Sequence, residues 1–265
     1  MAPNIFLGVR IARSRSYVLL LLAFFSLFLS EIITYAAEDP ICLEQLISEL
    51  AHPDPNRRWD AVAALGAGGD RRAVPLLMMM LEKDMKERTG IAMAIIPALS
   101  QLGDERAVPL LLKALNKPDE DWLGREAAAR ALGHIGSAKA VPDLIRTVWK
   151  AESRNAAIEA LAAIGDPRAT DVLMSALSVP EEPEAREAAI AGLVYIGEPA
   201  VPALIDKLNT RREGYPENHE RALAAMILGR IGDRLAVDTL TRALDDPSEE
   251  VRKSAETALE CLKGQ

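Results

Sequence analysis

Aromatic residues and cysteines are scarce in this 265-residue chain, and each shortage excludes a class of protein. Only 4% of the residues are aromatic, whereas β-sheet proteins are enriched in aromatic and β-branched side chains. An all-β sandwich or barrel is therefore not expected. Two cysteines and three histidines supply few ligands for a metal and few thiols for a disulfide framework. We expect no metal site and no other cofactor.

An excess of positive charge is missing as well. Thirty-one Lys and Arg residues stand against 39 Asp and Glu residues, which gives a formal net charge of −8. This sign opposes binding to a phosphate backbone, so we expect no nucleic-acid partner. The apolar content of 49% is nevertheless high enough to bury a sizeable core, which excludes a mainly disordered chain.

The longest apolar run lies near the amino terminus. Three arginines at positions 10, 13 and 15 precede the uncharged run VLLLLAFFSLFLS at residues 18–30, and two alanines follow at 36 and 37. This order of basic, apolar and small residues is typical of a secretory signal peptide. The thirteen uncharged residues are fewer than the roughly 20 that a membrane-spanning helix needs.

The amino-terminal pattern predicts the location of the protein. We predict that residues 1–36 are a signal peptide cut after Ala36, and that residues 37–265 are exported, to the periplasm or to the medium. The alternative is an uncleaved segment that anchors the same protein in the membrane, facing outward. In both cases residues 37–265 are predicted to form the folded part.

Internal repeats decide the architecture of that part. The phrase LGHIG at residues 132–136 recurs in altered copies along the chain. Each copy is followed within a few residues by a second phrase, AVP or a near copy of it, of which residues 107–109 are one example. The last glycines of the first phrase are 29 to 35 residues apart: Gly69, Gly103, Gly136, Gly165, Gly197 and Gly232. Seven units of about 32 residues fill the chain from Leu43 onward, with no Gly/Ser-rich linker. This pattern predicts one continuous array.

Each unit is predicted to contain two helices. In the third unit, Asp104 can cap the amino terminus of the first helix, and Pro109 lies near its first turn. The second helix, REAAARALGHIG at residues 125–136, has alanine, leucine and isoleucine at helical spacing on one face. Small alanines let neighbouring helices approach closely. A single pair cannot bury this face alone, so stability must come from stacking of the units.

These phrases resemble the HEAT repeat, in the short variety named after the phycobilisome lyases. The hallmarks are AVP at the start of the first helix, an arginine early in the second and LGxIGD at its end, and they extend over essentially all of residues 37–265. The resemblance implies an all-α fold of the armadillo type. It would be a right-handed α-solenoid of about seven antiparallel helix pairs, with the second helices on the concave side. A repeat scaffold does not by itself imply an activity.

The arginine at the start of the second helix recurs in six units: Arg58, Arg125, Arg154, Arg186, Arg221 and Arg252. A ligand site would not need the same residue six times. We therefore predict that each arginine bonds the preceding turn or an acidic residue of the adjoining unit, instead of forming a ladder for anions. Ala92 replaces the arginine in the second unit and Pro97 lies within its second helix, so this unit is expected to be irregular.

Two related families are enzymes, the bilin lyases and deoxyhypusine hydroxylase. The hydroxylase holds two irons with His-Glu pairs, but this chain has one such pair, His219 with Glu220, out of register with the helical ligand positions. The lyases work in the cytoplasm, which conflicts with a signal peptide. We predict no catalytic residues. An enzyme or enzyme accessory related to these families is the alternative.

The predicted second helices leave one face unburied. Positions one, five and nine residues after each arginine form a stripe, here called the concave stripe. It contains the residues that we predict to bind a partner: Trp59, Met93, Arg130, His134, Tyr195, Met226 and Arg230. Such side chains are enriched in protein interfaces. Alternatively, Trp59 caps the exposed end of the core.

The longest spacer between predicted paired helices, residues 209–220, offers a second candidate surface. Arg211, Arg212 and Tyr215 lie in it, and a long loop is either a contact element or a tolerated insertion. The sequence as a whole predicts a scaffold that binds an unidentified protein or peptide along its concave face.

Overall fold

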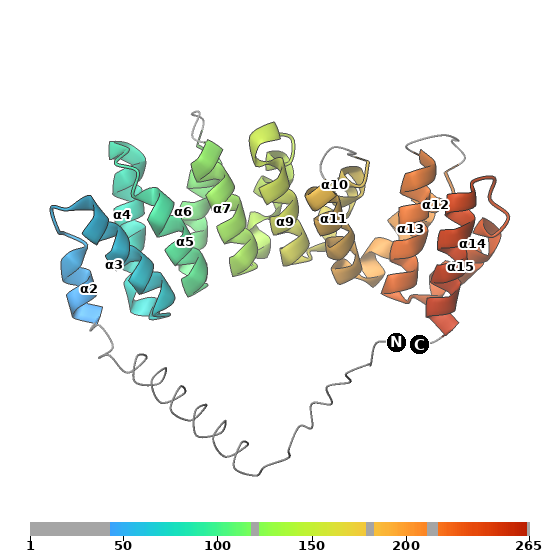
Figure 1. The fold of residues 1–265 in the computed structure, drawn as a ribbon, viewed down its shortest axis with the longest axis horizontal. Coiled ribbons are helices and arrows are strands. Elements are labelled where there is room, and N and C mark those ends of the chain that lie inside the picture. Colours follow the sequence, from blue (N-terminus) through green and yellow to red (C-terminus); the bar gives the residue numbers. More distant parts are fainter. Residues whose placement is uncertain (1–42, 118–121, 179–182, 211–216, 264–265) are drawn as a thin grey trace, which may run out of the picture. The chain divides into compact units, whose positions relative to one another are not determined.

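The computed structural model describes residues 43–117, 122–178, 183–210 and 217–263 (Figure 1). Within these ranges the chain forms fourteen α-helices and no β-strand, which confirms the predicted all-α solenoid. Residues 46–265 make one compact unit. The predicted signal peptide, residues 1–36, lies outside the described residues.

The described helices alternate between two layers (Figure 1). The first helices of the pairs are α2 (Leu43–Glu49), α4 (Val74–Glu87), α6 (Val108–Leu115), α8 (Val141–Thr147), α10 (Thr170–Ala176), α12 (Val201–Leu208) and α14 (Val237–Ala243). The second helices are α3 (Pro55–Ala67), α5 (Ala92–Leu102), α7 (Trp122–Ile135), α9 (Arg154–Ile164), α11 (Pro183–Ile196), α13 (Glu217–Ile231) and α15 (Glu249–Lys263). Second helices of adjacent units contact each other far more extensively than first helices do. The resemblance implies that this more closely packed layer is the concave side.

Aspartates begin several of the first helices, as predicted. Asp104 lies before a short 3-10 turn, η2 (Glu105–Ala107), and its carboxylate accepts a 2.9 Å hydrogen bond from the Arg106 backbone N–H. The Arg106 guanidinium also donates to this carboxylate, and these bonds together lower the pKa of Asp104 to about 2. The same guanidinium reaches the Arg71 carbonyl of the preceding unit, at 3.1 Å. The aspartate and arginine thus cap the turn and connect two units.

The second helices approach closely because glycine faces alanine across the unit boundary. A Cβ placed on Gly133 of α7 would lie 2.6 Å from the Ala160 Cα of α9, and one on Gly229 of α13 would lie 2.6 Å from the Ala258 Cα of α15. Real side-chain carbons do not come so near, so the first glycine of the repeated LGxIG phrase is required for this packing. The prediction from sequence credited alanine alone with the close approach.

The second unit is irregular, as expected, in the turn that precedes α5. Helix α5 runs through Pro97, whose side chain is exposed. Arg88, at the end of α4, instead has left-handed backbone angles, with φ 57°. Ala92 cannot make the hydrogen bonds of the missing arginine. Asp84 organises this turn instead, because its buried carboxylate accepts from the N–H groups of Thr89, at 2.8 Å, and Ala92, at 3.0 Å.

Among the described residues no single helix is long and apolar enough to cross a membrane. One bent pair, α11 with the segment Glu198–Leu208, meets that test of length and composition when its two helices are taken together, with a bend of 111°.

Candidate partner-binding face

The structure places the predicted residues of the concave stripe on successive second helices. Six of them are exposed: Trp59, Met93, Arg130, His134, Tyr195 and Arg230. Tyr195 is the most open of the apolar ones, at 70% exposure, while Trp59 is 43% and Met93 37% exposed. In these units the stripe is therefore exposed on the surface of the second-helix layer.

The stripe departs from its predicted exposure at α13. Met226 is half-buried, and Ala222, predicted to be the exposed position one turn before it, is 3% exposed and belongs to the core. The prediction is wrong for Ala222. The physical reason is that α13 makes the most extensive helix contact of the described chain, with α15, and also packs on α12. A regular spacing rule cannot anticipate that difference between units.

The polar members of the stripe connect adjacent units. The Arg130 guanidinium on α7 pairs with Glu126 of the same helix, at 2.5 Å, and with Glu159 of α9, at 3.3 Å. Partial burial acts to lower the pKa of Arg130, but the two carboxylates outweigh it and raise that pKa. His134 lies one turn further along α7, and its Nδ1 is 3.0 Å from the Ser100 hydroxyl of α5. Arg130 and His134 therefore both have bonding partners within the scaffold itself.

Tyr195 covers a turn of the preceding unit. Its ring, carried by α11, occupies the space beside Gly165 into which a Cβ would project, and Gly165 has φ +67°. A side chain at residue 165 would therefore be strained in its backbone and would collide with the ring. The contact fixes the tyrosine while leaving most of its surface in solvent.

Other exposed apolar side chains lie outside the stripe and are not predicted from the sequence. Met79 on α4, Trp149 after α8 and Leu235 in the turn η7 (Arg234–Ala236) are 62%, 69% and 71% exposed. Met79 could have been found by asking which first-helix positions face away from the buried Leu77 and Leu81. Arg211, Arg212 and Tyr215 of the second candidate surface lie outside the described residues.

Five of the six recurrent arginines make bonds of the predicted structural kind. The Arg58 guanidinium donates to the carbonyls of His52, at 2.8 Å, and Pro53, at 2.9 Å. Equivalent bonds to carbonyls of the preceding turn are made by three further arginines: Arg125 to Lys117, Arg154 to Val148 and Arg252 to Asp246 and Pro247. These guanidiniums satisfy carbonyls between the paired helices.

Arg221 bonds an acidic residue of the adjoining unit, which is the second role predicted for these arginines. Its side chain is nearly fully buried and makes a two-pronged ion pair with the Asp246 carboxylate of the next unit. The same guanidinium donates to the Asn218 side chain at 2.7 Å. This pair is a buried ionic contact that joins the sixth and seventh units.

The two residues of the single His-Glu pair, His219 and Glu220, bind different partners. His219 Nδ1 lies 2.6 Å from a Glu250 carboxylate oxygen, whereas Glu220 is buried and pairs with the Lys207 ammonium at 2.5 Å. Burial acts to raise the pKa of Glu220, but hydrogen bonds from Lys207 and Ser178 prevail and lower it. In the described ranges no three His, Cys, Asp or Glu side chains form a group that could hold a metal ion.

The matches to protein-family models agree with the repeated helix pairs of the structure. The model for HEAT repeats matches residues 43–123 and 117–194, which together span more than half of the chain. The chain belongs to the HEAT-repeat family. A model for the PBS lyase HEAT-like repeat also matches this HEAT-repeat protein, over residues 220–246.

Solved structures include several repeat proteins similar to this HEAT-repeat chain. One is the complex of CpcE and CpcF of phycocyanin lyase from Nostoc sp. PCC7120, with 26% identity and a TM-score of 0.52 over 84% of this chain and 88% of that one. Human deoxyhypusine hydroxylase in complex with glycerol has 20% identity and a TM-score of 0.43 over 89% and 99%. A designed armadillo repeat protein has 18% identity and a TM-score of 0.37 over 83% and 99%. No curated protein sequence matches the chain significantly.

Proposed function

We propose that this HEAT-repeat protein is an exported scaffold that binds another protein or a peptide along the concave stripe and has no catalysis of its own. The observation that carries the proposal is the row of exposed interface-type side chains on the second helices, above all Trp59, Met93 and Tyr195. The core does not require them there, because leucine, isoleucine and alanine on the opposite faces fill it. The similar CpcE and CpcF proteins are themselves described as a complex, which supports a role in protein association.

An enzyme or an enzyme accessory is the second candidate. The observation that favours it is the similarity to the phycocyanin lyase complex. Against it, the described part of the chain ties its His-Glu pair to Lys207 and Glu250 and leaves neither side chain directed at a common ligand. A bilin or a metal that copurifies with the protein in stoichiometric amount would support the enzyme.

Replacing the exposed stripe residues should weaken partner binding without unfolding the protein. The partner is first isolated from the envelope or secreted fraction, and its affinity is then measured for Trp59→Ala, Met93→Ala and Tyr195→Ala. At least one of them should lose about 1 kcal/mol or more of binding free energy. The free energy of unfolding should change by about 0.5 kcal/mol or less, because no buried cavity forms.

Met79→Ala and Leu235→Ala are the matched controls, since both remove exposed apolar side chains outside the stripe. Binding that falls only in these two variants would place the interface elsewhere. An early unfolding transition of Trp59→Ala would assign that residue to the core.

Export is proposed from the order of residues at the amino terminus, and the mature end tests it. Sequencing of the protein purified from its native host should find Ala37 first, in the periplasmic or secreted fraction. Retention of residues 1–36 in the membrane fraction would support the anchored form. A full-length product in the cytosol would contradict both.

A further inference from the structure

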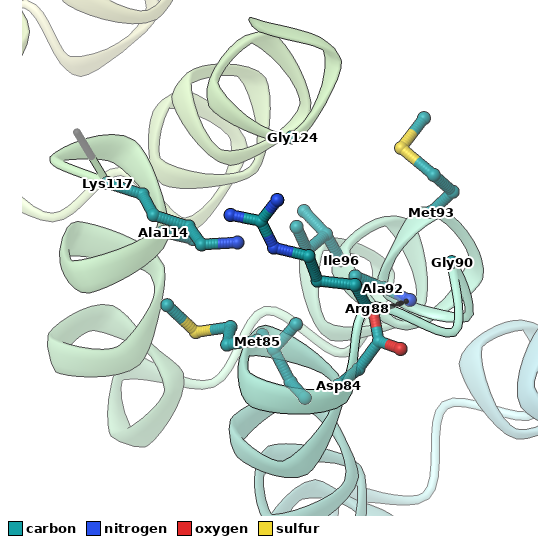
Figure 2. A pocket seen from close by; sticks show the side chains of 11 residues that line it. Asp84, Met85, Arg88, Gly90, Ala92, Met93, Ile96, Ala114, Lys117 and Gly124 are labelled. Carbon is teal, nitrogen blue, oxygen red and sulfur yellow. Dashed lines mark hydrogen bonds between the residues drawn. The ribbon is translucent and has the colours of Figure 1, made fainter. Parts of the chain in front are cut away.

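The repeat pattern changes in the second unit, and a pocket opens there. The pocket has a volume of about 390 Å³ and lies between α4 and α5 on one side and α6 and the start of α7 on the other. Figure 2 shows Met93 and Lys117 on opposite sides of its opening. The apolar side chains that line it are Leu81, Met85, Met93, Ile96 and Ala114.

Two small residues border the pocket and leave space in it. Ala92 stands in the arginine column, so a methyl group occupies a position that an arginine side chain takes in six other units. Gly124, near the start of α7, has no side chain at all. Met85 and Met93 add flexible thioethers, which adapt to the shape of the group that they contact.

The charged residues that border the pocket already interact with other groups of the chain. The Asp84 carboxylate accepts hydrogen bonds from the backbone N–H groups of Thr89, at 2.8 Å, and Ala92, at 3.0 Å. Arg88 and Lys117 also have partners within the chain. No ligand of opposite charge is therefore needed to compensate them, and a further charge would lose hydration beside the apolar lining. The pocket favours an uncharged occupant.

The size of the pocket and its sulfur atoms indicate which uncharged group fits. A volume of about 390 Å³ exceeds the roughly 150 Å³ of an engineered apolar cavity that binds benzene. One aromatic ring can therefore enter together with the backbone atoms next to it. The thioethers of Met85 and Met93 favour an aromatic ring over an aliphatic chain, because sulfur makes favourable contacts with ring edges.

We propose that this pocket between α4 and α6 binds the phenyl ring of a phenylalanine in the partner. Met93 belongs to the concave stripe as well as to the pocket, so a segment that lies along the stripe on α5 passes the opening. The ring then provides the anchor, and the rest of the segment follows the stripe. The inference rests on the proposed function, since the partner supplies the phenylalanine.

Two neutral probes that differ only in the ring test the proposal, N-acetyl-phenylalanine amide and N-acetyl-alanine amide. The protein carries ¹³C-labelled methionine methyl groups, of which Met85 and Met93 report on the pocket and Met174 and Met226 on distant units. The phenylalanine probe should shift the Met85 and Met93 signals alone. It should bind at least about tenfold more tightly than the alanine probe, because burial of the ring adds to its affinity.

Ala92→Leu should weaken binding of the phenylalanine probe by at least about fivefold, because the larger side chain takes up space in the pocket. Ala138→Leu is the matched control, since it makes the same change at an exposed alanine outside both the pocket and the stripe. Met85→Ala, which removes one thioether, should weaken binding at least about threefold, with Met93 as the reporter. Unchanged Met174 and Met226 signals show that each variant is folded.

Equal binding of the two neutral probes, or full affinity of folded Ala92→Leu for the phenylalanine probe, would overturn the proposal. Tighter binding of N-acetyl-glutamate amide would also overturn it, because the pocket would then select a charge.

The isolated partner distinguishes an anchor for a protein from a site for a free small molecule. Ala92→Leu should weaken its affinity at least about fivefold and Ala138→Leu should not. If the probe binds but the affinity for the partner is the same in Ala92→Leu as in the unmodified protein, the proposal is wrong. The scaffold function still stands in that case if the stripe variants weaken partner binding, so the two proposals fail separately.

Discussion

Leu161→Ala should lower the free energy of unfolding by about 2 to 5 kcal/mol, the range found when a fully buried leucine is truncated and leaves a cavity. Leu161 is fully buried in α9, in the middle of the described stack, where α9 packs against α7 on one side and α11 on the other. Each unit is stabilised mainly by its neighbours, so a defect there weakens two boundaries at once. Urea unfolding followed by circular dichroism at 222 nm measures the change.

Leu235→Ala provides the matched control for this change. It deletes the same atoms from a side chain that is 71% exposed, and should alter stability by about 0.5 kcal/mol or less. Equal destabilisation by the two variants would contradict the packing described for α9.

Asp246→Ala should destabilise the protein by about 3 kcal/mol or more, because it leaves the Arg221 guanidinium buried without its carboxylate. The Arg221 side chain is 5% exposed and the Asp246 side chain 11% exposed. Asp246 also accepts a 2.9 Å bond from the Ser248 backbone N–H, so the variant loses a second contact just before α15. Thermal and urea unfolding both measure this effect.

Glu82→Ala is the corresponding control at the surface. Glu82 and Lys113 also join adjacent units, with 3.6 Å between their charged atoms, but both side chains are more than half exposed. Exposed ion pairs contribute about 0 to 1 kcal/mol. If Asp246→Ala were no more harmful than Glu82→Ala, the buried ion pair would add no more to the contact between the sixth and seventh units than an exposed pair does.

Local signals predicted most of the scaffold. Asp104, Pro109 and the apolar spacing specify where a helix begins and which face it buries, and these are properties of neighbouring residues. The arginine column was also predictable, because its recurrence in six units favours a structural role, and Arg58 and Arg252 do bond the preceding turns.

What the sequence could not supply depends on contacts between units. Ala222 is buried because α13 packs so extensively on α15, and the spacing of residues within α13 does not reveal this. The need for glycine at residue 133 comes from the Ala160 backbone of the next unit. The pocket between α4 and α6 could not be predicted for a related reason: it combines the left-handed turn at Arg88 in one unit with Lys117 from the next.

Site-specific photo-crosslinking tests the central claim, that a partner binds along the concave stripe, most directly. A benzophenone amino acid replaces Tyr195 or Trp59 on the stripe, and Met79 or Leu235 outside it, in protein produced in the native host. Irradiation should join the same partner to both stripe positions and to neither control position. Adducts formed only at Met79 or Leu235, or no adduct at any position while the partner still copurifies, would contradict binding along the stripe.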